Sequence, residues 1–180
     1  MAIELQRGDA SVLNELSCEL GGVHKIAFKE DIKIFNGYTY CTESCIIRIY
    51  SKDIVYDLIN KNVLPNKTNK KDFPICNHLF FEFLRGFFDG DGCIYINPRK
   101  QISAKFTNAN LDFLNYLLKE IQKRLSISGS IYKETDKKYI LMYYRKSDVK
   151  ILLDSMYENS NCCFLNRKYE IYKSYYGSPA

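Results

Sequence analysis

The sequence has no apolar run that reaches the roughly 18 residues needed to cross a bilayer. Its N-terminus also lacks a basic segment followed by an apolar one, the pattern typical of a secretion signal. Both absences argue against membrane and secreted proteins. We therefore expect a protein that is not secreted, that functions in the cytoplasm and that has no membrane partner.

Paired CxxC motifs, a common signature of structural zinc sites, are also missing. The chain has seven cysteines, an odd number, and Cys41 and Cys45 have no second pair of ligands at zinc-site spacing. We expect reduced thiols, most of them small residues of the hydrophobic core.

The composition is that of a folded protein: the 180 residues are 46% hydrophobic and 26% charged. Lysine and arginine together number 26 against 21 acidic residues, which gives a net charge of +5. Such a surplus favours an anionic partner such as nucleic acid, although many soluble proteins carry a similar charge.

The chain repeats itself at an offset of 101 positions. Leu13 and Leu114 are separated by that offset, and so are Lys67 and Lys168. Each copy reads as a short strand, a helix, two strands and a second helix, and Asn36-Gly37 in the first copy is a strong hairpin signal. We predict two half-domains, 1–73 and 74–180, with helices over 10–20, 52–62, 111–125 and 147–157 and paired strands over 25–35, 38–50, 129–134 and 139–145.

Strands of the second copy alternate between apolar and polar side chains. Ile102, Ala104 and Phe106 share one face, whereas Ser103 and Lys105 share the other. This period of two predicts an α+β fold with antiparallel sheets, one face packed on helices and the other in water. The polar face has the chemistry to read base edges and phosphates, but taken alone this observation favours an ordinary solvated sheet surface.

A helix with a broad apolar stripe is predicted between the copies, starting at Phe80. Gly86 and Gly90 are four positions apart and therefore share one face of this helix. Each glycine within a helix costs roughly 1 kcal/mol relative to alanine. Two glycines on the same face therefore favour the close approach of another helix.

Acidic residues end the same helix. Asp89 and Asp91 would lie at the negative end of the helix dipole, which is unfavourable unless a cation lies nearby, and a divalent metal ion would supply one. We expect Gly92 in the left-handed cap conformation, before a strand over 93–96. The alternative is an ordinary acidic turn between a helix and a strand.

Residues 84–92, Leu-Arg-Gly-Phe-Phe-Asp-Gly-Asp-Gly, resemble the LAGLIDADG motif of homing endonucleases at Leu84, Gly86, Asp89, Asp91 and Gly92. The resemblance implies duplicated αββαββα half-domains, whose antiparallel sheets form a DNA-binding saddle and whose motif helices pack together. The first copy lacks its motif helix. We therefore expect either a missing N-terminal segment or a homodimer joined through Gly86 and Gly90.

The resemblance also implies a reaction, the metal-dependent hydrolysis of phosphodiester bonds in double-stranded DNA. It makes Asp91 the catalytic ligand of Mg²⁺ (or Mn²⁺) and the carbonyl of Gly90 a second ligand. Lys168 and Lys67 match basic residues that the family places near the attacking water. For both lysines, the alternative is a solvated surface charge.

Eight residues of the second half are expected to contact DNA. Two other readings stay open: a non-cleaving nucleic-acid binder, such as an intron maturase or a degenerate regulator, and an interaction module in which the motif is coincidental. The protein would be bacterial, phage or organellar, and its target site and its host intron or intein are not named by the sequence. The expected DNA contacts are Tyr95, Asn97, Arg99, Gln101, Ser103, Lys105, Tyr132 and Lys133.

Overall fold

The structure, a computed structural model, describes residues 1–63, 78–158 and 163–177. The chain divides into two compact units. Unit 1 comprises residues 1–56 and 161–166, and unit 2 comprises residues 57–160 and 167–180. The predicted boundary between residues 73 and 74 lies outside the described residues. No helix in the described part of the chain is long and apolar enough to cross a membrane.

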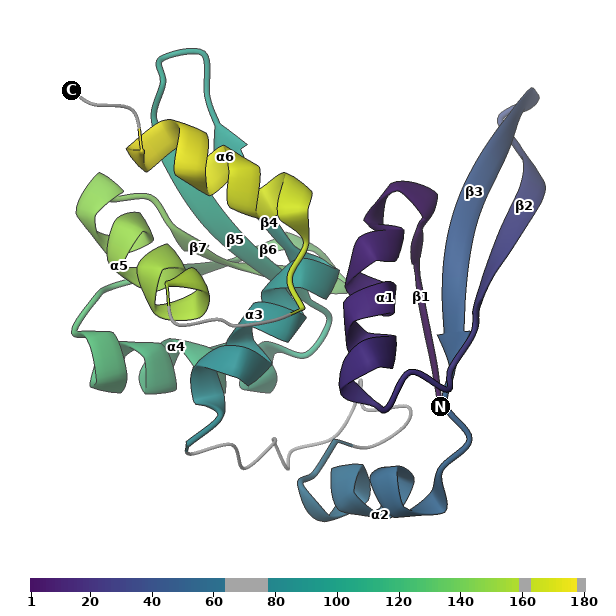
Figure 1. Cartoon of the computed structure of the whole chain (residues 1–180). Helices are drawn as coiled ribbons and strands as arrows, with labels where there is room; N and C mark the ends of the chain where they lie inside the picture. The colour runs from purple at the N-terminus through teal and green to yellow at the C-terminus, as the bar shows by residue number, and fades with distance from the viewer. Residues whose placement is uncertain (64–77, 159–162, 178–180) are drawn as a thin grey trace. The chain divides into compact units, whose positions relative to one another are not determined.

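Unit 1 is built on a three-stranded antiparallel sheet. Its strands lie in the order β1-β3-β2, so that β3 pairs with both neighbours. A short 3-10 turn (Arg7–Asp9) connects β1 to α1, and α2 follows β3 (Figure 1). The elements are β1 (Ala2–Gln6), α1 (Ala10–Glu19), β2 (Ile26–Phe35) and β3 (Tyr38–Arg48), followed by α2 (Lys52–Asn60), which begins in unit 1 and ends in unit 2.

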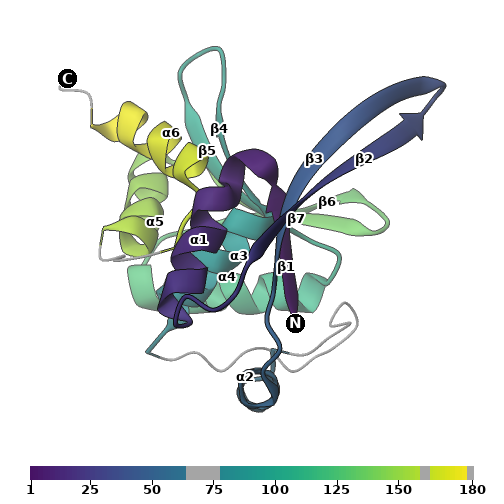
Figure 2. The same ribbon diagram turned by 45° about the vertical axis from the view of Figure 1, so that its right-hand side comes forward.

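The core of unit 1 lies between α1 and the base of this sheet. Leu13 of α1 packs with Cys45 and Ile47 of β3, and all three are almost fully buried. The hairpin of β2 and β3 extends beyond α1 (Figure 2), and there Ile32 and Ile34 are 77% and 75% exposed. In unit 1, helix α1 therefore packs only on the base of the β2–β3 hairpin.

The predicted hairpin turn at Asn36-Gly37 is confirmed. Asn36 has φ 51° and Gly37 has φ 81°, so both central residues of the two-residue loop have positive φ. Glycine and asparagine tolerate this conformation, and turns of this kind match the right-handed twist of the strands they join.

Unit 2 contains a four-stranded antiparallel sheet in the order β4-β5-β7-β6. Helices α3, α4 and α5 cover one face of this sheet (Figure 1). Residues buried between the layers include Phe106, Leu141 and Leu153. The elements are α3 (Phe80–Asp91), β4 (Gly92–Ile96), β5 (Ile102–Asn108), α4 (Leu111–Leu125), β6 (Ser130–Thr135), β7 (Lys138–Tyr143), α5 (Lys146–Tyr157) and α6 (Asn166–Tyr176).

The predicted duplication is visible in the topology of the two units. The order β1-β3-β2 in unit 1 corresponds to β5-β7-β6 in unit 2, and α1 corresponds to α4. The fold is therefore α+β with two antiparallel sheets, as the alternating strands predicted. Unit 2 has α3 and β4 in addition, and the described residues of unit 1 contain no counterpart of either element.

The expectation that most cysteines are core residues is wrong for the described part of the chain. Cys45 is buried, but Cys18, Cys41 and Cys93 are exposed and Cys163 is intermediate; all five are free thiols. Cys41 belongs to the part of β3 that extends beyond α1, and Cys93 lies on the outward face of β4. Small apolar side chains are therefore not confined to the core of this protein.

Candidate metal-binding carboxylate and nucleic-acid interface

Helix α3 forms as predicted, from Phe80 to Asp91. Its apolar stripe is buried at Phe80, Leu84 and Phe88. Phe87 stacks on Phe106 of β5 at a centroid distance of 5.9 Å. Aromatic packing of this kind adds to area burial and fixes α3 against the four-stranded sheet.

Gly86 and Gly90 lie on the exposed side of α3. A Cβ atom built at either glycine would meet no described atom within 4 Å. Nothing within unit 2 therefore requires glycine at these two positions. Open glycines on one helical face leave room for the backbone of a second helix, although the packing itself stays a prediction.

The expectation of a left-handed cap at Gly92 is wrong. Gly92 has φ −100° and ψ 168°, which is extended backbone that any residue adopts. The reason for glycine is steric instead: a Cβ atom at this position would overlap both the ring and the carbonyl oxygen of Phe88. The chain thus passes from α3 into β4 without an intervening loop, and this tight junction fixes the position of Asp91.

The two acidic residues of the motif have different surroundings. Asp91 is the last residue of α3 and is exposed. Asp89 is half-buried, and its Oδ1 accepts a hydrogen bond of 3.3 Å from the hydroxyl of Tyr157 in α5. Burial, followed by the charge of Asp89, raises the pKa of Tyr157. Asp89 therefore helps to hold α3 on α5, whereas Asp91 is accessible to a ligand.

Lys168 of α6 is the cation at the end of α3. Its side chain is only 4% exposed. Nζ donates to the backbone carbonyls of Phe88, Asp89 and Gly92 at 2.5, 2.8 and 2.7 Å. An ammonium has three N–H groups. These three carbonyls therefore account for its whole donor capacity.

Two sequence-based expectations change as a result. The alternative of a solvated surface charge is wrong for Lys168, because the side chain is buried. The dipole of α3 also needs no metal ion, because a lysine side chain already places a positive charge at its C-terminal end. A metal at Asp91 must therefore be argued from other observations. Lys67, the repeat partner of Lys168, lies outside the described residues.

Arg85 is a residue whose role the sequence did not reveal. It is 8% exposed, and its Nη1 donates to the carbonyl of Met156 in α5 at 3.1 Å. Arg85 replaces the alanine of the motif and therefore adds a further link between α3 and α5. Nothing in the local pattern of the sequence distinguishes it from a surface arginine.

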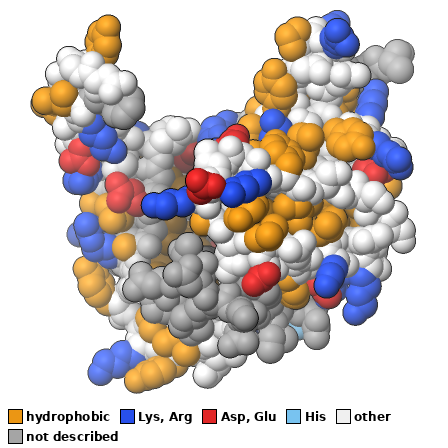
Figure 3. All heavy atoms as spheres, turned by 180° about the vertical axis from the view of Figure 1, so that it is seen from behind, with side chains coloured by type: hydrophobic (Ala, Val, Ile, Leu, Met, Phe, Trp, Pro, Cys, Tyr) orange, Lys and Arg blue, Asp and Glu red, His pale blue; other side chains and the backbone are white. Residues whose placement is uncertain are grey.

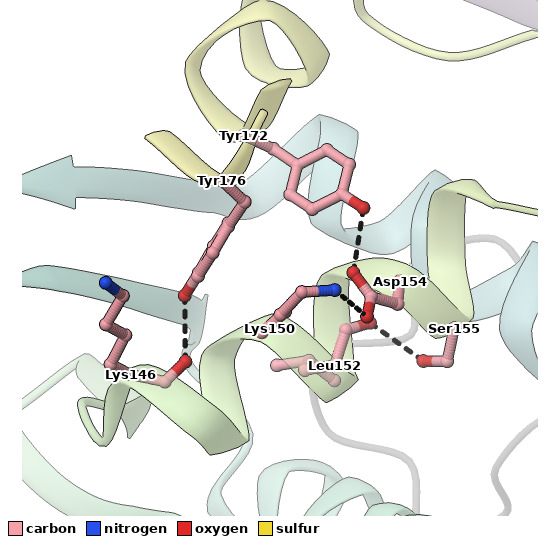
Figure 4. A network of polar contacts seen from close by, with 7 residues as sticks. All are labelled: Lys146, Lys150, Leu152, Asp154, Ser155, Tyr172 and Tyr176. Carbon is pink, nitrogen blue, oxygen red and sulfur yellow. Dashed lines mark hydrogen bonds and ion pairs between the residues drawn. The ribbon is translucent and has the colours of Figure 1, made fainter. Parts of the chain in front are cut away.

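Helix α6 is held on α5 by a polar network (Figure 4). Tyr172 donates to Asp154 at 2.7 Å, Lys150 pairs with the same carboxylate at 2.6 Å, and Tyr176 donates to the carbonyl of Lys146 at 2.8 Å. Burial raises the pKa of both tyrosines, so they remain neutral donors near neutral pH. The network fixes α6 and, with it, the position of Lys168.

Four of the predicted DNA contacts share the outward face of the four-stranded sheet, which is the face opposite to the helices. Tyr95 pairs with Ser103, and Lys105 lies in the next row, where its Nζ is 5.3 Å from the centre of the Tyr95 ring. The register places Tyr132 of β6 on the same face. Figure 3 shows the molecule from behind, with tyrosine counted among the hydrophobic side chains. On this side, hydrophobic side chains reach the surface beside lysine and arginine.

The remaining predicted contacts lie in the β4–β5 loop beside these residues or on the opposite face of the sheet. Asn97 and Gln101 close the loop between β4 and β5, where Gln101 N donates to Asn97 Oδ1 at 2.9 Å, and Arg99 is an exposed residue of that loop. Lys133 has the opposite orientation to Tyr132, because neighbouring residues of a strand point to opposite faces. Its ammonium pairs with Asp136 at 2.8 Å. The predicted contacts on β4 and β5 and Tyr132 of β6 thus share one face of the sheet, whereas Lys133 points to the other face.

The comparison with protein families identifies the core of unit 2. Residues 80–156 match the family model of the LAGLIDADG-like domain. This match begins at the first residue of α3 and ends one residue before the end of α5. Over these residues, the chain is similar to the LAGLIDADG-like domain family.

Solved structures with the same fold include DNA-bound homing endonucleases. Meganuclease I-SmaMI bound to uncleavable DNA is 14% identical with a TM-score of 0.61, and it matches over 97% of this chain and 77% of its own. Homing endonuclease I-GzeII in complex with its DNA target is 15% identical, with a TM-score of 0.58 over the same shares of the two chains.

A third similar structure is the N-terminal LAGLIDADG domain of DUF199/WhiA. It is 16% identical with a TM-score of 0.54, over 87% of this chain and 70% of that one. At such identities the likeness shows the fold alone. No match of significance was found among curated proteins.

Proposed function

We propose that this chain binds double-stranded DNA and hydrolyses its phosphodiester bonds with a divalent metal ion when two motif helices are brought together. The observation that carries the proposal is the placement of Asp91. It is an exposed carboxylate at the end of a helix with an open glycine face, where the chain enters a sheet with a polar outward face.

The donor atoms at this position suit a hard cation. The carboxylate of Asp91 and the carbonyl of Gly90 are oxygen ligands, which Mg²⁺ and Mn²⁺ prefer. The carbonyl of Gly90 is not among the three that Lys168 binds. When bound, a divalent metal ion activates water and stabilises the leaving oxygen.

A complete site needs a second acid. The described residues contain no group of three or more His, Cys, Asp or Glu side chains that could hold a metal ion. They also contain a single motif helix, α3. The second helix would come from a second copy of the chain or from another segment, and the open face at Gly86 and Gly90 would allow the two backbones to approach closely.

The outward face of the four-stranded sheet supports the DNA-binding part of the proposal. Lys105 offers a cation for phosphate, whereas Tyr95 and Ser103 offer hydroxyl groups for base edges or backbone. The affinity for DNA should therefore fall with salt, because phosphate contacts release counterions.

Cleavage is tested with the full chain, a plasmid library of randomised sites and Mg²⁺. Asp91→Asn should abolish cutting and leave DNA binding in place, because the outward sheet face is unchanged. Asp91→Asn should also fold normally, since it removes a negative charge from the C-terminal end of a helix.

Asp136→Asn is the matched control, because it makes the same change in an exposed acid of the β6–β7 turn. Cutting that survives Asp91→Asn would refute the assigned role of Asp91. The absence of DNA binding at low salt would refute the whole proposal and favour an interaction module.

A second candidate function is DNA or RNA binding without cleavage. The hydrogen bonds of Lys168 favour this function, because its three bonds to backbone carbonyls leave the ammonium no N–H group for an attacking water. Binding by the wild-type protein without cutting, at any Mg²⁺ or Mn²⁺ concentration, would support this alternative.

A further inference from the structure

We infer that unit 2 has a cleft that binds a single unstacked nucleotide of the nucleic acid lying on its outward sheet face. The inference rests on the proposed DNA binding and names a substrate feature, a base outside the stack. The cleft lies where the β4–β5 loop, the end of β7 and the C-terminal half of α6 meet, and its volume is about 450 Å³. That volume is within the range of pockets for small organic ligands.

The walls of this cleft combine aromatic rings, amides and ammonium groups. Tyr95, Tyr144 and Tyr175 supply the rings, and Lys105 and Lys146 supply the charges. The described residues that line the cleft include no acid. Neither lysine forms an ion pair with a described residue, so both charges are available to an anion.

The lysines are held against the cleft by their neighbours. Lys105 Nζ lies 5.3 Å from the centre of the Tyr95 ring, and Lys146 Nζ lies 5.4 Å from the centre of the Tyr175 ring. Tyr175 in turn donates to the carbonyl of Lys100 at 2.8 Å and so links α6 to the β4–β5 loop. Two preplaced cations suit the phosphates on either side of one nucleoside.

Tyr144 is the ring that can accept a base. It is 56% exposed, and among the residues that the structure describes its ring has no aromatic or cationic partner. Every nucleobase has a flat face that stacks on such a ring. A paired base inside a duplex already has neighbours above and below, so a base must leave the stack to use this ring.

The test compares three duplexes of one sequence: fully paired, with a single bulged thymidine, and with a bulged abasic site. Their dissociation constants for the full chain are measured by fluorescence anisotropy at one salt concentration. The thymidine bulge should bind about fivefold to 150-fold more tightly than the abasic bulge, because it offers a base to Tyr144. The abasic bulge controls for the greater flexibility of any bulged duplex.

Variants locate the effect. Tyr144→Ala should reduce the preference for the thymidine bulge to less than twofold, and Tyr144→Phe should retain it, because the ring rather than the hydroxyl carries the stacking. Tyr132→Ala is the matched control, since it removes an exposed tyrosine of the same sheet face outside the cleft. The ratio of the affinities for the two bulges should survive Tyr132→Ala even if both affinities fall.

Equal binding of the two bulged duplexes would overturn the inference while leaving the proposed DNA binding intact. If no duplex binds, the proposed function itself is wrong. The cleft is then tested with a free trinucleotide whose central thymidine has a phosphate on either side. The NMR signals of the Tyr144 ring are followed as the trinucleotide is added. Signals that do not move would overturn the inference in that case as well.

Discussion

Replacing Lys168 by methionine would measure how strongly α6 holds the end of α3. Methionine keeps an unbranched side chain of similar length but has no donor and no charge. Phe88 O would still accept from Gly92 N, whereas Asp89 O and Gly92 O would lose the partner they have in Lys168. The change therefore acts on a few carbonyls at the end of one helix.

The magnitude follows from these contacts. A buried carbonyl left without its donor costs about 1–3 kcal/mol, and a cation at a helix C-terminus contributes about 0.3–1 kcal/mol, or up to about 2 kcal/mol when partly buried. Removing the ammonium also relieves the cost of its burial, which offsets part of the loss. We expect a net loss of about 2–4 kcal/mol in the free energy of unfolding, a large share of the stability of a typical domain.

The assay is urea unfolding followed by circular dichroism. Lys173→Met is the matched control, an exposed lysine on the same helix, and it should change the free energy of unfolding by less than about 0.5 kcal/mol. Lys168→Arg should also be destabilised, because a planar guanidinium cannot direct three N–H groups to carbonyls placed around a single atom.

Equal unfolding midpoints for Lys168→Met and Lys173→Met would refute the assignment of Lys168 to the three carbonyls. If Lys168→Met unfolded like the wild type and yet lost cleavage, Lys168 would instead act on the attacking water, as the family resemblance implied.

Three further expectations follow from the same structure. Gly86→Ala should stabilise the isolated chain by about 0.5–1 kcal/mol, because its Cβ meets no described atom, and it should weaken any association through α3 in sedimentation experiments. Gly92→Ala should destabilise it by about 1–3 kcal/mol in urea unfolding, since its Cβ would overlap Phe88. Burial raises the pKa of Tyr157 above its ordinary value of 10.0, so the contribution of Tyr157 to the free energy of unfolding should be constant below about pH 10 and fall above it, where the unfolded chain loses a proton that the folded chain keeps. Urea midpoints measured across this pH range should show a shallower fall for Tyr157→Phe.

Local patterns in the sequence predicted the local structure well. Asn36-Gly37 marks a turn by its own conformational preferences, and the stripe from Phe80 to Phe88 marks a helix by its period. The repeat predicted a shared topology because both copies have the same order of strands and helices. These features depend on residues that are close in the chain.

The surroundings of the site depend on residues far apart in the chain. Lys168 contacts Phe88 across 80 positions, and no local pattern shows that a lysine near the C-terminus is buried. The same holds for Arg85 and Met156, which are 71 positions apart. The expectation at Gly92 fails for a different reason: a glycine after a helix commonly marks a left-handed cap, whereas Gly92 makes room for the ring of Phe88.

The path of the chain limits how the two units can be separated. Residues 163–166 belong to unit 1, although most of unit 2 precedes them. Leu165 in this segment is 2% exposed, and Cys163 N donates to Glu15 Oε2 at 3.0 Å. A fragment that ended before this segment would lose these contacts, so a single cut between the repeats should leave the first unit less stable than it is in the full chain.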